Sequence, residues 1–257
     1  MVRHMRSAVV ALLVILAAVG VGAAARDHRP APFGDAVVTR GSAPASPVAY
    51  LRRGSEGSVE LYDPRSALVS WSYRRPGAAP LRLFALAGTT VVVWDDGMLT
   101  GLGPALGGAA PTVRWHRFVP GLADWGKEDD GGGPLLAPLD GGTVFLVPTP
   151  HLMLTFTTAD GTIRADTLPP AGCAYDPSRA VQLGDSVVLP RPCETQSTLD
   201  AFGPNGRRWQ APTSPLARPT ALPDGSLGLW DVPALHPYRI DLDTGRRPAA
   251  ERPGSLP

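Results

Sequence analysis

The feature that most constrains this chain is a repeat of short strands and tight turns that begins near Pro47. Each copy contains β-branched and apolar runs typical of buried strands, such as residues 90–94 and 143–147. Asp-Gly and Asn-Gly pairs between the runs supply the positive φ that hairpin turns need. The late turns of successive copies fall at Arg65, Gly107, Gly161, Gly206 and Gly245, at intervals of 42, 54, 45 and 39 residues.

A period of about 40–45 residues with several strands in each copy is typical of a β-propeller, which is built from four-stranded sheets. The interval of 54 contains an 11-residue insert at 124–134, and without it the interval would be 43. The sequence therefore predicts an all-β propeller of about five four-stranded blades, or six with degenerate ends. One hydrophobic helix is expected before the propeller.

Composition supports this prediction and excludes other classes. Gly and Pro number 29 each in 257 residues, yet 44% of the residues are hydrophobic, which is too many for a disordered chain. Pro at this density would break long helical bundles. The formal net charge is +1, and no nucleic-acid partner is expected because phosphate contacts need a clustered basic surface.

The N-terminal segment indicates export. Arg3 and Arg6 precede an uncharged apolar stretch at 8–25, which ends in three alanines. This pattern fits a cleaved signal peptide or an uncleaved membrane anchor, and the length of the stretch leaves both open. Either alternative predicts an extracytoplasmic protein, secreted or anchored by residues 8–25, whose membrane contact is limited to this segment.

The domain organisation follows from these patterns. Residues 1–25 are the signal or anchor, and 26–46 form a Pro/Ala-rich linker in which 35–39 could supply one strand. Residues 47–250 form the propeller, and 251–257 form a disordered tail.

The chain has two cysteines, Cys173 and Cys193, and both lie ten residues from Leu183 in a predicted tight turn. Partners at equal distances from a hairpin turn face each other, and an oxidising compartment favours their pairing. A structural disulfide is therefore predicted. A free thiol and a metal site are the alternatives, but no His-Cys spacing supports a metal site.

Tryptophan recurs at one place in the copies, a few residues after the late turn, at Trp71, Trp115 and Trp209. Indoles at one structural position are expected to pack between neighbouring blades.

Three segments resemble the PQQ-like propeller repeat, which reads roughly Ala-Leu-Asp-x-x-Thr-Gly-x-x-x-Trp. They are Leu199-Asp-Ala-Phe-Gly-Pro-Asn-Gly-Arg-Arg-Trp209, Tyr238-Arg-Ile-Asp-Leu-Asp-Thr-Gly245, and Leu61-Tyr-Asp-Pro with Trp71. The resemblance implies a β-propeller of a family that contains quinone-dependent dehydrogenases and non-catalytic exported proteins, including scaffold subunits of envelope assembly machines.

The chain departs from the catalytic branch of that family. The resemblance to quinone enzymes would imply adjacent cysteines and a calcium held by Glu, Asn and Asp, whereas these cysteines are 20 residues apart and Asn205 lies in a predicted hairpin turn. The acidic run 95–97 is read as a hairpin turn, with calcium contact as the alternative. No catalytic residue, cofactor or metal ligand is therefore predicted.

The insert contains the candidate partner-binding residues Trp125, Lys127, Glu128, Asp129 and Asp130. Extra residues in one copy of a repeat usually form a loop on one face, and an aromatic there can anchor a partner. The alternative is a solvated loop without a binding role.

The sequence favours a monomeric, non-catalytic binding or scaffold protein of the cell envelope, whose partner is an unidentified envelope protein or small ligand. Two alternatives remain open. One is a secreted hydrolase or lyase with a site in the central channel of the propeller, and the other is an extracytoplasmic sensor.

Overall fold

The computed structural model describes residues 36–39, 49–104, 111–128, 136–230 and 237–247. These residues are almost entirely strands, joined by tight turns, with one short α-helix. The helical elements are α2 (Leu122–Glu128) and the 3-10 turns η2 (Asp140–Gly142) and η3 (Pro177–Arg179). The strands are β1 (Ala36–Thr39), β2 (Tyr50–Arg53), β3 (Ser58–Asp63), β4 (Leu68–Arg74), β5 (Pro80–Leu86), β6 (Thr89–Trp94), β7 (Met98–Leu102), β8 (Val113–Phe118), β9 (Ala137–Leu139), β10 (Val144–Pro148), β11 (Met153–Thr157), β12 (Ile163–Thr167), β13 (Val181–Leu183), β14 (Ser186–Arg191), β15 (Thr198–Gly203), β16 (Gly206–Pro212), β17 (Arg218–Ala221), β18 (Leu227–Trp230) and β19 (Tyr238–Ile240).

The strands form five antiparallel sheets, which follow one another in chain order. Sheets two to four are four-stranded meanders, β5-β6-β7-β8, β9-β10-β11-β12 and β13-β14-β15-β16, and the fifth contains β17-β18-β19. The first sheet has the order β1-β4-β3-β2, so β1, which lies within the predicted linker, pairs with β4. The predicted all-β class of propeller blades is confirmed, and we call the sheets blades one to five.

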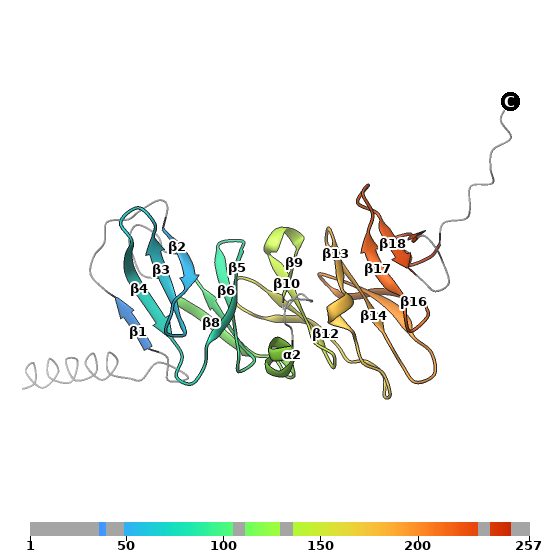
Figure 1. The fold of residues 1–257 in the computed structure, drawn as a ribbon, viewed down its shortest axis with the longest axis horizontal. Coiled ribbons are helices and arrows are strands. Elements are labelled where there is room, and N and C mark those ends of the chain that lie inside the picture. The colour runs from blue at the N-terminus through green and yellow to red at the C-terminus, as the bar shows by residue number, and fades with distance from the viewer. Residues whose placement is uncertain (1–35, 40–48, 105–110, 129–135, 231–236, 248–257) are drawn as a thin grey trace, which may run out of the picture.

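The blades stand in a row along the long axis of the molecule, with the first and the last at opposite ends (Figure 1). The described residues therefore form an open series of blades and not a closed ring. The strands β2, β5, β9, β13 and β17 run along one side of this row (Figure 1). Each of them is an edge strand of its own sheet in the described chain.

The hydrophobic core consists of layers between neighbouring blades. Because side chains alternate along a strand, the central strand of a blade serves two layers. Val92 and Trp94 of β6 pack toward blade one, whereas Val91 and Val93 pack toward blade three. The same alternation divides β10, whose Phe145 packs with blade two.

Turn chemistry follows the predicted pattern. The side-chain oxygen of Asp96 accepts a hydrogen bond from the Met98 backbone N–H, and Gly97 has φ of 82°. The run 95–97 is thus a hairpin turn between β6 and β7, as predicted.

The cysteines form the predicted disulfide. Their Cα atoms lie 4.1 Å apart, and the two residues face each other across an antiparallel bridge. The bond ties the segment before β13 to the segment after β14.

The predicted N-terminal helix and the tail at 251–257 lie outside the described residues. Among the residues that are described, no helix has both the length and the apolar character required to cross a membrane.

Candidate functional site

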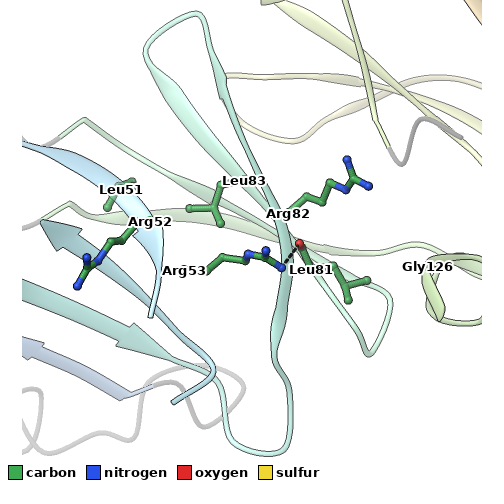
Figure 2. Close-up of a pocket in the computed structure, with 7 residues that line it drawn as sticks. All are labelled: Leu51, Arg52, Arg53, Leu81, Arg82, Leu83 and Gly126. Carbon is green, nitrogen blue, oxygen red and sulfur yellow. Dashed lines mark hydrogen bonds between the residues drawn. The ribbon is translucent and has the colours of Figure 1, made fainter. Parts of the chain in front are cut away.

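A cleft between the first two blades is the candidate functional site (Figure 2). Its volume is about 540 Å³. Two of its walls come from edge strands of different sheets, β2 and β5, and α2 borders it on the far side of β5 (Figure 2). The described lining residues are Leu51, Arg52, Arg53, Leu81, Arg82, Leu83 and Gly126.

A second hollow of about 720 Å³ adjoins this cleft and shares Arg52 and Arg53 with it. The second hollow extends past Glu60 and Val69 to Pro80 at the start of β5. The two hollows therefore form one groove along β2, which we call the arginine cleft.

The charge of Arg52 is matched within blade one. Arg52 and Glu60 are cross-strand partners on β2 and β3, and their side chains form an ion pair at 3.2 Å. The guanidinium carbon of Arg52 also lies 3.6 Å from the ring centroid of Tyr62, a cation–π geometry. A side chain on Gly54 would meet the Glu60 carboxylate, because its Cβ would lie 2.5 Å from Oε1.

Arg53 and Arg82 supply the unmatched positive charge of the cleft. Arg53 Nη1 donates a hydrogen bond of 2.9 Å to the carbonyl oxygen of Leu81, so it reaches from blade one to the edge of blade two (Figure 2). Arg82 is exposed and has no hydrogen bond or ion pair with any residue in the described part of the chain. With three arginines and one carboxylate, the described lining carries a formal charge of +2.

This arrangement suits recognition of an anion. The planar guanidinium group presents several donors in a fork that matches carboxylate or phosphate oxygens. The leucines at 51, 81 and 83 place apolar surface beside these donors. A ligand that fits both features combines negative charge with apolar groups.

The structure brings the predicted insert to this cleft. Residues 122–128 form α2, and Gly126 of this helix lines the cleft. Lys127 is exposed next to it, Glu128 ends the helix, and Asp129 and Asp130 lie outside the described residues.

Trp125 does not lie on the surface, contrary to the idea that it is an aromatic anchor. It is 8% exposed and packs in the layer between blades two and three with Val119 and Leu136. Burial of the large apolar ring in this layer is favoured over exposure to water, so Trp125 has a packing role in this structure. The binding role of the rest of the insert stays a prediction.

Sequence reasoning did not single out the arginines. A sequence signal for them is that Leu-Arg occurs at 51–52 and again at 81–82, on the edge strands β2 and β5 of successive blades. Contact between these strands depends on how two sheets pack, which local patterns do not encode.

Other chemistry-bearing residues are dispersed. No three His, Cys, Asp or Glu residues of the described chain lie close enough together to hold a metal ion. His116 shares a hydrogen bond of 3.1 Å with Thr100, whose hydroxyl also accepts from Trp94 Nε1.

The fold and the cleft define the class of the protein: a β-propeller-type chain with a cationic groove between two blades. No family model matches this chain, and no curated protein matches it.

Solved structures with a similar fold include two of low sequence identity. BamB from Moraxella catarrhalis is 12% identical with a TM-score of 0.47, and the match covers 78% of this chain and 56% of that chain. A protein from Lactobacillus plantarum is 11% identical with a TM-score of 0.42, and the match covers 74% of this chain and 63% of that chain. This chain thus spans less than two thirds of either structure.

Proposed function

We propose that this protein is an extracytoplasmic, non-catalytic binding or scaffold protein of the cell envelope, and that it binds an anionic partner in the arginine cleft. The observation that carries the proposal is the +2 charge of a groove that also presents three leucines. Arg53 is held by the Leu81 carbonyl, so one donor is already oriented before a ligand arrives.

The extracytoplasmic location is supported by the disulfide between Cys173 and Cys193, because such bonds persist in oxidising compartments. The apolar stretch at 8–25 adds the means of export, as a cleaved signal or as a membrane anchor. Mass measurement of the mature protein distinguishes these two forms.

The proposal is tested by affinity capture from native cell envelopes with a charge-reversed cleft. The variant Arg53→Glu with Arg82→Glu should lose the partner that the wild-type protein retains, because like charges repel an anionic partner.

The control is Arg218→Glu with Arg246→Glu, which makes the same change in net charge on exposed residues of blade five. The control should retain the partner. Equal capture by all three proteins would show that the partner binds elsewhere, and equal loss in both variants would show a non-specific charge effect.

A further inference from the structure

We infer that the occupant of the arginine cleft is an extended acidic peptide segment of a partner protein, which adds as a strand to the free edge of β5. The inference rests on the proposed function and specifies the chemistry of its ligand.

The strand β5 has an open edge at the cleft. In the described chain β5 pairs only with β6, so one long side of its seven residues lacks a strand partner. The N–H and C=O groups of an edge strand that point away from the sheet can pair with another chain. Arg53 already bonds one such group, the carbonyl of Leu81, so an added strand would pair with the outward groups of β5 beyond Leu81.

The two sides of β5 present different side chains to the cleft. In Figure 2, Leu83 points toward β2, on the same side as Leu51, whereas Arg82 points to the opposite side, where Gly126 of α2 lies. A peptide strand beside β5 would alternate its side chains between these same two sides, because the side-chain period of a strand is two residues. One set would meet Leu51 and Leu83, and the other would meet Arg82.

The charge of the cleft favours an acidic peptide. Arg52 is paired with Glu60, so Arg82 and Arg53 are the cations available to a ligand among the described lining residues. A segment that alternates acidic and apolar residues places its acidic side chains beside Arg82 and its apolar side chains beside Leu51 and Leu83. A single small anion would use the guanidinium groups alone and leave the leucines without a partner.

The experiment is fluorescence anisotropy with dye-labelled synthetic peptides. The first probe has eight residues that alternate Glu and Val. The controls are a block peptide of four Glu followed by four Val and a peptide that alternates Lys and Val. The alternating acidic probe should bind, whereas the block peptide should bind more weakly and the Lys peptide should not bind.

Variants of the protein identify the cleft. Arg82→Gln should raise the dissociation constant of the alternating probe by about three- to tenfold, since a charge-assisted hydrogen bond at a partly exposed site is lost. Arg82→Lys should restore part of the binding, and Arg218→Gln should leave it unchanged. Unchanged unfolding curves show that each variant keeps its fold.

Backbone methylation tests strand addition directly. A strand bonds its neighbour through alternate N–H groups, so methylation of one alternating set of peptide amides should abolish binding. Methylation of the other set should be tolerated. Equal binding of both methylated peptides would overturn the strand geometry.

Binding of inorganic tripolyphosphate or of vesicles rich in anionic lipid as tight as that of the alternating probe would also overturn the inference. If envelope capture depends on Arg53 and Arg82 but the alternating probe does not bind, the peptide inference fails while the proposed function stands.

Discussion

The indole of Trp115 lies flat against Gly161, a residue of the next blade. A Cβ atom placed on Gly161 would lie 2.7 Å from Cδ2 of this ring, so the position has no room for a side chain. Nε1 of Trp115 donates to the carbonyl oxygen of Thr158 at 3.0 Å, in the same turn. Trp209 of blade four repeats the relationship with blade five, where its ring lies against Gly245 and Nε1 donates to the carbonyl oxygen of Leu242. The repeated tryptophans thus join neighbouring blades.

This relationship predicts that Gly161→Ala destabilises the protein more than Gly225→Ala does. Both glycines have positive φ, 66° and 79°, so both variants carry a backbone penalty of about 1 kcal/mol. The methyl group at 225 meets open space, whereas the one at 161 overlaps Trp115 and should cost about 1–3 kcal/mol more. Urea unfolding of both variants measures the difference, and equal midpoints would contradict the packing role.

The disulfide is expected to stabilise the fold because it lowers the conformational entropy of the unfolded chain. It joins residues 20 apart, and closing a loop of that length corresponds to about 3 kcal/mol in the chain-entropy model. Cys173→Ser with Cys193→Ser should therefore unfold at lower urea than the wild type. A reductant should lower the wild-type midpoint toward that of the double variant and leave the double variant unchanged. A wild-type midpoint that does not respond to reductant would count against this contribution.

Local patterns predicted the blades because strand and turn signals are short-range. The β-branched, apolar run of β6 and the Asp96-Gly97 turn depend on neighbouring residues only, and so does the symmetry of Cys173 and Cys193 about their turn. The position of Trp115 and Trp209 after the late turns also predicted their packing between blades.

Features that depend on packing between sheets were not predictable in the same way. The open row of blades results from the rotation between successive sheets, which no single repeat contains (Figure 1). The arginine cleft needs Arg53 and Arg82 on two edge strands 29 residues apart. The burial of Trp125 was not predictable because a polar, Gly-rich surrounding sequence predicts a loop, whereas the short helix α2 directs the indole into the core.

Substitution of Asp200 in blade four is predicted to cause a large loss of stability. Its carboxylate is 0% exposed and accepts from Arg191 Nε at 3.1 Å and from Thr198 Oγ1 at 2.6 Å. Asp200→Ala leaves the buried guanidinium of Arg191 without its counter-charge, which typically costs about 3–5 kcal/mol. Addition of Arg191→Met should recover part of this loss, because the uncompensated charge is then removed. Thermal unfolding of the single and double variants checks both expectations, and a double variant no more stable than Asp200→Ala would contradict the charge argument.

Asp96 is predicted to make stability depend on acid pH. Partial burial opposes its ionisation, but the hydrogen bonds from Arg75 and from the Met98 N–H, with the charge of Arg75, hold the pKa of Asp96 below its usual 3.8. The folded state therefore binds the proton more weakly than the unfolded state. This stabilisation is present above about pH 4 and is lost as the pH falls through the folded pKa.

Asp96→Asn should reduce stability at pH 7 by about 1 kcal/mol, since the partly exposed pair is screened by solvent. The difference from the wild type should shrink below pH 4. Asp166→Asn, at an exposed residue of β12, is the matched control. A constant difference from pH 2 to pH 7 would be inconsistent with ionisation of Asp96.

Removal of the Tyr175 hydroxyl is predicted to keep or raise the stability of the fold. Its side chain is 2% exposed and packs edge-on against Phe202, and its hydroxyl has no hydrogen-bond partner among the described residues. Burial, with the negative charge of Asp200, raises the pKa of Tyr175 to about 12. Tyr175→Phe keeps the ring contacts and removes a buried polar group, so it should leave stability at pH 7 unchanged or raise it by up to about 1 kcal/mol.

Tyr175→Phe should also change how stability falls at alkaline pH. A phenol whose pKa is raised in the folded state stays protonated there while the unfolded chain ionises, so the wild type loses stability as the pH rises above 10. Tyr175→Phe removes this contribution and should lose less stability than the wild type between pH 9 and pH 11. Tyr50→Phe, at a half-exposed ring, is the control and should follow the wild type. A Tyr175→Phe variant that is less stable at pH 7 would show that the hydroxyl has a bonding partner.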